Sequence, residues 1–263
     1  MNAVHDFPRF KAEGRMISMV TAYDAWSARI AARSNVDALL VGDSVAMVVH
    51  GHPTTLSASV EMLAMHTCAV ARAAGGKLVI ADLPFLSYRK GLYAAMDAVE
   101  ALMTSGAQAV KLEGVDGHEE VVRHIVGSGV PVMGHIGLMP QHLHQAGGYR
   151  VQGRTELAAD TLRHQARTLE ALGCFAIVIE CVPGPLAARI TAELQVPTIG
   201  IGAGGGTDGQ ILVFHDLLGV GPGPFPRFVR RYLEGECLLT NALNAYAADV
   251  TKRQFPNDEE TYA

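Results

Sequence analysis

Four short apolar runs in the chain each stop at a carboxylate. These carboxylates are Asp43, Asp82, Glu113 and Glu180. Continuous apolar runs of this length, separated by helix-sized segments, are typical of buried parallel strands, whose C-terminal ends meet at one face. Acidic side chains that converge there need a cation or a shared proton to offset their repulsion. A hard metal ion is therefore the first hypothesis for this chain.

The positions of the acids favour a magnesium site. Oxygen ligands without paired histidines or clustered cysteines favour Mg²⁺ or a similar divalent ion, which binds one or two carboxylates together with substrate and waters. We predict Asp43 and Asp82 as direct ligands, and Glu113 as a ligand that binds directly or through water. Each acid alone is explained better by a helix N-cap or a surface ion pair, and only their joint placement favours the metal. Lys111 lies two residues before Glu113, so both side chains point to the same side of one strand.

Two further side chains at strand ends have the types that proton transfer requires. Glu180 ends the very apolar run 176–179, where loss of hydration would raise its pKa toward the range of a general base. The alternative is that Glu180 only accepts hydrogen bonds from the backbone or from an arginine. His135 closes the run 132–135 and can donate to a developing oxyanion.

Two other motifs are weaker. His142 and His144 have no third ligand at a spacing diagnostic of zinc. Residues 200–205 match the pattern GxGxxG, but they come late in the chain, which favours a barrel loop over a dinucleotide site. A phosphate or cofactor anion at the start of the following helix stays open.

The segments that must position these residues alternate between strand and helix. Strands are expected at 16–22, 38–43, 78–82, 109–113, 130–135, 175–181, 196–201 and 211–215, with helices at 59–74, 91–105, 156–172 and 185–194 and a last helix over 225–246. No linker divides the chain, and its 263 residues match the roughly 250 typical of a TIM barrel. We therefore predict one α/β domain, a (β/α)₈ TIM barrel, over residues 1–250. Residues 251–263 are polar, and we expect a mobile tail there.

Composition excludes several classes of function. The chain is 49% hydrophobic, carries a formal net charge of −5 and has no basic block, which argues against nucleic acid or an anionic membrane as partner. No apolar run is long enough to span a bilayer. The four cysteines lie far apart without a CxxC pair, as in thiols of a reducing cytoplasm. We expect a cytoplasmic enzyme that acts on small molecules.

Eight segments of the chain together resemble one enzyme family. They are residues 19–24, 41–44, 81–85, 110–114, 134–138, 147–154, 180–183 and 199–204. In these segments the chain is similar to the ketopantoate hydroxymethyltransferases, also called 3-methyl-2-oxobutanoate hydroxymethyltransferases, and the resemblance covers almost the whole length. Two positions depart from the family pattern, Ala46 in place of a glycine and the segment 223–226, and neither removes a candidate catalytic side chain.

The resemblance implies a fold, a reaction and an assembly. The fold is a TIM barrel of the phosphoenolpyruvate/pyruvate type. The reaction uses Mg²⁺ and 5,10-methylenetetrahydrofolate to add a hydroxymethyl group to α-ketoisovalerate, which gives ketopantoate for pantothenate and coenzyme A biosynthesis. The assembly is a homo-oligomer, decameric in many members.

The resemblance also assigns roles to residues of this chain. By matching motif positions, Asp43 and Asp82 resemble metal ligands that also contact substrate, and Glu113 a further or water-mediated ligand. The same matches imply substrate contacts for Ser44, Lys111 and His135, and the role of general base for Glu180.

Two alternatives of other kinds stay open. One is a Mg²⁺-dependent C–C lyase or mutase of the isocitrate lyase type, although the Lys-Lys-Cys-Gly-His-type loop of those enzymes is absent. The other is a non-catalytic barrel that binds a ketoacid. Glu180 and Lys111 distinguish these possibilities, since a binding protein has no need of a proton-transfer base beside a metal.

Overall fold

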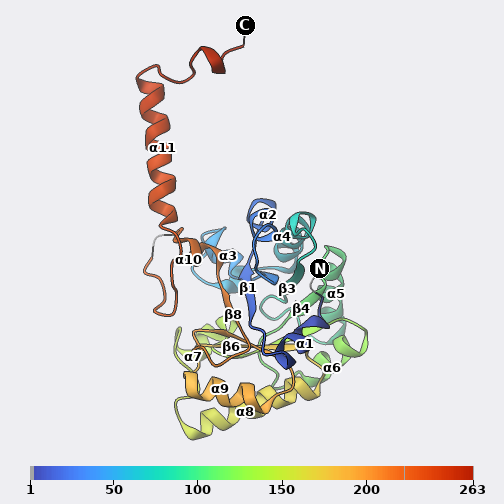
Figure 1. Ribbon diagram of the computed structural model, residues 1–263. Helices are drawn as coiled ribbons and strands as arrows, with labels where there is room; N and C mark the ends of the chain where they lie inside the picture. The colour runs from blue at the N-terminus through green and yellow to red at the C-terminus, as the bar shows by residue number, and fades with distance from the viewer. Residues whose placement is uncertain (1–2, 222, 263) are drawn as a thin grey trace. The chain divides into compact units, whose positions relative to one another are not determined.

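The computed structural model describes residues 3–221 and 223–262. Eight parallel strands close into a barrel in sequence order, which confirms the predicted TIM barrel (Figure 1). The strands are β1 (Ile17–Thr21), β2 (Ala38–Val41), β3 (Leu78–Asp82), β4 (Ala109–Lys111), β5 (Val132–Gly137), β6 (Ala176–Glu180), β7 (Thr198–Ile201) and β8 (Gly209–Leu212). All neighbouring strands run parallel, so their C-terminal ends share one face.

Helices connect the strands, and three of the longer ones begin at a side chain that caps them. The longer barrel helices are α2 (Ala25–Ala32), α4 (Val60–Ala73), α5 (Leu92–Thr104), α6 (Glu119–Gly127), α8 (Glu156–Ala171) and α9 (Gly184–Glu193). The side chains of Asp24, Ser59 and Thr155 accept a backbone N–H in the first turn of α2, α4 and α8. These side-chain oxygens satisfy donors that the first helical turn leaves unpaired.

Shorter helical segments occupy several loops. They are α1 (Asp6–Ala12), α3 (Val45–Val48), η1 (Thr55–Ser57), η2 (Pro140–His142), α7 (Leu143–Ala146) and α10 (Phe214–Leu218). Three of these segments, α3, η2 and α7, follow the C-terminal ends of β2 and β5. They therefore belong to the face where the predicted acids converge.

The N-terminal end of the barrel is filled by apolar side chains. Phe7 and Phe10 of α1 pack in one buried cluster with residues that begin strands, among them Ile17 and Leu78. The ring of Phe7 meets that of Phe175 edge-on at 5.5 Å. Burial of several aromatic rings at this end contributes to stability and offers no polar group for chemistry.

The last strand differs from the expected one. We expected a strand over 211–215, but β8 begins at Gly209 and Phe214 already starts α10. A side chain at Gly209 would collide with the carbonyl oxygen of Ile17, so this glycine permits the close pairing of β8 with β1. The Phe214 N–H donates to Thr21 Oγ1 at 2.8 Å, which turns the chain away from the sheet.

The chain divides into two units, Met1–Phe214 and His215–Ala263. The second unit contains α11 (Gly235–Thr251) and the short helix η3 (Asp258–Glu260), so the boundary expected at 250 falls inside a helix. The helix expected over 225–246 begins only at Gly235 and continues to Thr251. Mobility of residues 251–263 stays a prediction. Within the described ranges, no helix has both the length and the apolar character needed to cross a membrane.

Candidate active site

Five of the predicted site residues lie at or near the C-terminal ends of the five neighbouring strands β2 to β6. Asp43 follows β2, Asp82 ends β3, and Lys111 ends β4. His135 lies within β5 and Glu180 ends β6. The structure therefore brings the candidates to one end of the barrel, where the active sites of TIM-barrel enzymes lie.

Two aspartates and one lysine form the buried centre of this group. The Asp43 backbone N–H donates to Asp82 Oδ2 at 3.0 Å, and Lys111 Nζ lies 2.7 Å from Asp82 Oδ1. The pairing of Asp82 with Lys111 in the β3–β4 register explains this ion pair. Glu113 Oε1 lies 3.9 Å from the same Nζ. The four side chains are almost fully buried.

A glycine lets β2 and β3 bring these groups together. A Cβ atom at Gly42 would lie 2.9 Å from Ser44 Oγ and 3.5 Å from Asp82 Oδ2. Ser44 itself sits at the start of α3 and makes no capping hydrogen bond. Its hydroxyl instead pairs with the hydroxyl of Tyr23 at 2.7 Å. Ser44 is thus held toward the acids by a buried phenol that sequence reasoning missed.

The charges in this centre do not balance. Burial, together with the charge of Asp82, raises the pKa of Asp43 to about 7. Burial also raises the pKa of Asp82, and it raises that of Glu113 well above its ordinary value. Burial alone would lower the pKa of Lys111, but the surrounding carboxylates raise it instead, so this lysine stays charged. One ammonium faces three buried acids, and this excess of acidic oxygens fits a divalent cation.

The donor set fits Mg²⁺ better than a metal held by protein alone. In the part of the chain that the structure describes, no group of three or more His, Cys, Asp and Glu side chains is arranged as a ready-made metal site. Mg²⁺ commonly binds one or two carboxylates and takes its remaining ligands from water and substrate. The Asp43–Asp82 pair meets that requirement.

His135 is neutral, and its neighbours favour one tautomer. Its Nδ1 lies 3.4 Å from Lys111 Nζ, which only donates, and 3.6 Å from Glu113 Oε1, so the closer ammonium favours the tautomer with the hydrogen on Nε2. Burial and the nearby Lys111 lower the pKa of His135 well below its ordinary value. Nε2 lies 3.5 Å from Glu180 Oε2 and has no hydrogen-bond partner among the described residues. An N–H donor is therefore available beside Glu180.

Glu180 combines a raised pKa with access to the barrel mouth. Burial raises its pKa to about 8, and the charges of Asp43 and Asp82 act in the same direction, although Lys111 opposes them. Its side chain keeps 15% exposure. The next residue, Cys181, has φ of 48°, a left-handed conformation that non-glycine residues adopt at a cost and often near functional sites. These properties suit a general base.

The backbone that supports Glu180 has a strict steric requirement. Gly137 pairs with Glu180 in the β5–β6 register, and its φ is +95°. A Cβ atom at this position would collide with the Glu180 carbonyl oxygen. That oxygen accepts the Leu138 N–H at 2.8 Å. Only glycine satisfies both the conformation and the close approach here.

Sequence reasoning missed two other buried residues in the site. Gln141 of η2 donates its backbone N–H to Glu113 Oε2 at 3.0 Å. The Tyr88 hydroxyl hydrogen-bonds to the Glu113 backbone, with its oxygen 2.9 Å from the carbonyl oxygen. Neither residue lies at a strand end, so no periodic pattern marks them. The one available signal is that η2 belongs to the loop directly after His135.

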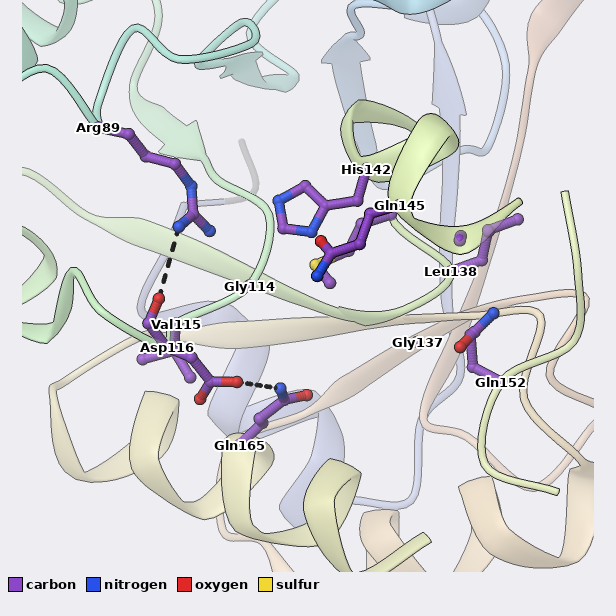
Figure 2. Close-up of a pocket in the computed structure, with 12 residues that line it drawn as sticks. Arg89, Gly114, Val115, Asp116, Gly137, Leu138, His142, Gln145, Gln152 and Gln165 are labelled. Carbon is purple, nitrogen blue, oxygen red and sulfur yellow. Dashed lines mark hydrogen bonds between the residues drawn. The ribbon is translucent and has the colours of Figure 1, made fainter. Parts of the chain in front are cut away.

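A cavity of about 450 Å³ opens beside the ends of β4 and β5 (Figure 2). Its wall includes Arg89, Asp116, Leu138, His142, Gln145 and Gln165. Gln165 Nε2 donates to Asp116 Oδ2 at 2.6 Å. Arg89 donates to the backbone carbonyl oxygens of Glu113 and Asp116, so the wall of the cavity adjoins the backbone of Glu113. The cavity thus presents a carboxylate, amides and a guanidinium next to the site.

Comparisons with known proteins point to one enzyme family. The family model of ketopantoate hydroxymethyltransferase matches residues 2–258. Proteins named 3-methyl-2-oxobutanoate hydroxymethyltransferase include one from Bdellovibrio bacteriovorus, 53% identical and covering 100% of both chains, and one from Legionella pneumophila, 52% identical and covering 98% of this chain and 99% of its own. A third such protein, from Coxiella burnetii, is 50% identical and covers 97% and 96%.

Solved structures share the barrel at low sequence identity. Phosphonopyruvate hydrolase, in a complex with oxalate and Mg²⁺, gives a TM-score of 0.66 at 11% identity and covers 99% of this chain and 93% of its own. 2,3-Dimethylmalate lyase, a member of the phosphoenolpyruvate mutase/isocitrate lyase superfamily, gives 0.59 at 17% identity and covers 100% and 92%. These two likenesses concern the fold, whereas the match over 2–258 and the full-length relatives concern the family. The chain belongs to the ketopantoate hydroxymethyltransferase family.

Proposed function

We propose that this chain transfers a hydroxymethyl group from 5,10-methylenetetrahydrofolate to 3-methyl-2-oxobutanoate (α-ketoisovalerate) and so forms 2-dehydropantoate (ketopantoate). The observation that carries the proposal is the placement of Glu180, with a pKa raised to about 8, beside the buried group of Asp43, Asp82 and Lys111. Family membership supports the same reaction. The small-molecule substrates fit a site enclosed by strand ends and loops.

The acidic pair would hold a divalent cation, for which Mg²⁺ is our proposal. Asp43 and Asp82 supply oxygen ligands, and Glu113, which interacts with the charges of both aspartates, would be a further or water-mediated ligand. When bound, such an ion supplies Lewis-acid polarisation of the keto and carboxylate oxygens of the ketoacid. Lys111 keeps its charge, so it can pair with the substrate carboxylate and offset the acids around it.

Glu180 removes the proton from C3 of the ketoacid. Its raised pKa matches the weak acidity of a carbon next to a ketone better than an ordinary carboxylate would. The electron pair of the broken C–H bond forms the enolate, and then the new C–C bond to the one-carbon unit. Water supplies the hydroxyl group, and tetrahydrofolate leaves. His135 presents its Nε2–H at this place, and Ser44 is held there by Tyr23.

We place the folate donor in the cavity beside β4 and β5. The edge of a pterin carries adjacent N–H groups, and a carboxylate such as that of Asp116 can accept hydrogen bonds from them. The wall of the cavity also supplies amide groups. Asp116→Asn should raise the KM for the donor about tenfold, because a charge-assisted hydrogen bond from the pterin is lost. The ketoacid half of the reaction should not change, and an unaltered donor KM would remove Asp116 from this site.

Location and assembly are proposals that rest mainly on the sequence and the resemblance. A cytoplasmic enzyme agrees with four cysteines that are all free thiols. A homo-oligomer, with a decamer as the specific expectation, follows from the resemblance. Light scattering that shows a monomer would refute the assembly without touching the chemistry.

The first experiment is to follow the C3 proton of α-ketoisovalerate in D₂O by NMR, with Mg²⁺ present and the folate absent. Loss of the proton signal that requires both the cation and Glu180 would establish proton abstraction at this site. Addition of 5,10-methylenetetrahydrofolate should then yield ketopantoate. A wild-type chain that forms no ketopantoate under these conditions would refute the proposed reaction.

The same experiment separates the other candidates. A non-catalytic ketoacid-binding barrel would bind the ketoacid and the cation but exchange no proton. A C–C lyase or mutase would cleave or rearrange a larger acid and would not depend on a folate. Exchange of the C3 proton without transfer of a hydroxymethyl group would therefore argue against the hydroxymethyltransferase reaction. It would still support Glu180 as the base.

A further inference from the structure

Gln141 contacts two of the candidate metal-site acids at once. It is 4% exposed and lies in η2, in the loop that follows β5. Its side-chain Nε2 donates to Asp43 Oδ2 at 3.0 Å and to the Leu83 carbonyl oxygen at 3.0 Å. Its backbone N–H donates to Glu113 Oε2. One residue thus joins the ends of β2, β3 and β4.

The orientation of the Gln141 amide is fixed by its partners. The Leu83 carbonyl oxygen only accepts, so the atom that faces it must be the NH₂ group. The amide oxygen in turn lies 3.2 Å from the Tyr88 hydroxyl oxygen, whose single hydrogen is shared with the closer Glu113 carbonyl oxygen at 2.9 Å. Both amide hydrogens are therefore used. A rotated amide would place its oxygen against two acceptors.

We infer that Gln141 is a positioning residue, which holds the carboxylates of Asp43 and Glu113 in the arrangement that a divalent cation requires. An amide donates hydrogen bonds to a carboxylate without adding a second positive charge to that of Lys111, and a second positive charge would repel the cation. The inference deepens the proposed function, since it concerns the same site. Partners that orient metal ligands in this way typically change metal affinity or activity 10–100-fold when they are lost.

The test is the affinity of the full chain for Mn²⁺, measured by electron paramagnetic resonance without any substrate. Gln141→Met removes both amide hydrogens at nearly constant volume and keeps the backbone contact to Glu113. We expect the Kd for Mn²⁺ to rise about 10–100-fold. C3 proton exchange should fall at low Mn²⁺ and recover toward the wild-type rate at saturating Mn²⁺, which a merely structural defect would not allow.

Gln108→Met is the matched control. The Gln108 side chain also bonds to the backbone, accepting the Val79 N–H at 3.0 Å, but it does so at the opposite end of β3 and β4. Its loss should leave the Kd for Mn²⁺ unchanged. If Gln141→Met does not fold, Gln141→Asn keeps a polar amide and withdraws it by one methylene group from Asp43. A rise in Kd is again expected.

The result that would overturn the inference is a wild-type Kd for Mn²⁺ in a folded Gln141→Met or Gln141→Asn chain. Failure of the proposed function looks different. A wild-type chain that binds Mn²⁺ but forms no ketopantoate would refute the reaction, and a raised Kd in Gln141→Met would still support the positioning role.

Discussion

The two ends of the barrel solve opposite problems with the same eight strands. At the N-terminal end, Phe7, Phe10 and Phe175 pack against the first residues of the strands. At the C-terminal end, carboxylates and Lys111 are buried almost as deeply. Burial of rings stabilises the fold, whereas burial of unbalanced acids costs stability and prepares a site for a cation and a base. The difference shows that the two ends can be altered separately.

The largest effect on stability is expected at the apolar end. Phe7→Ala deletes a fully buried ring and leaves a cavity, which should lower the free energy of unfolding by about 3–5 kcal/mol. Chemical denaturation measures this loss, and the turnover number of the folded fraction should not change. Tyr93→Ala, at a ring that is 90% exposed, is the control and should have almost no effect. A matching loss of turnover in Phe7→Ala would show that the two ends are coupled.

The largest effect on chemistry is expected at Glu180. Glu180→Gln keeps the shape of the side chain but cannot accept the C3 proton, so exchange should slow about 10³-fold, equivalent to about 4 kcal/mol. NMR in D₂O measures it, and Mn²⁺ affinity should persist. Glu193→Gln, at a surface glutamate paired with Arg163, is the control. Full exchange activity in Glu180→Gln would exclude Glu180 as the base.

Loss of a metal ligand should give a smaller effect. Asp82→Ala removes the carboxylate that contacts both Lys111 and the Asp43 backbone, and Mn²⁺ affinity should fall about 100-fold. Titration with Mn²⁺ provides the measurement. Asp160→Ala breaks an exposed ion pair with Arg163 and should leave affinity unchanged. If Asp82→Ala binds Mn²⁺ as tightly as wild type, Asp82 is no ligand.

The smallest effect is the pH dependence of exchange. The Glu180 carboxylate is active only when deprotonated, so the rate should rise about tenfold per pH unit and then level off. A cation between Asp43 and Asp82 would offset the negative charges that help to raise the pKa of Glu180, so the midpoint of the pH–rate curve should lie below about 8. Burial of Glu180 should still hold this midpoint above the ordinary 4.5. A midpoint of the pH–rate curve near 4.5 would show that water fully hydrates Glu180 at the mouth of the barrel.

The same pKa links Glu180 to stability. Because its pKa is raised in the folded chain, its protonated form stabilises the fold at low pH, and that contribution is lost as pH rises from 4.5 to about 8. A buried acid at the mouth therefore costs stability at neutral pH. No comparable cost arises from the rings of Phe7 and Phe10.

Much of the barrel is predictable from the sequence because its strands are apolar on both faces. The strand expected at 78–82 has the bounds of β3, because an apolar run that stops at a charge has a clear end. The strand expected at 175–181 is one residue longer at each end than β6. The strand expected at 211–215 begins earlier, at Gly209, because close contact with β1 decides that pairing and leaves no periodic signal. The local sequence likewise gives no signal that α11 begins as late as Gly235.

The sequence by itself determined the fold class and the acids at strand ends, because both follow from hydrophobic periodicity and from residue type. The tertiary structure decided which groups touch. It paired Asp82 with Lys111, placed Nδ1 of His135 beside Lys111, and brought in Gln141 and Tyr88 from loops. Hydrogen bonds between residues distant along the chain depend on strand register and loop geometry, and local sequence patterns do not encode these.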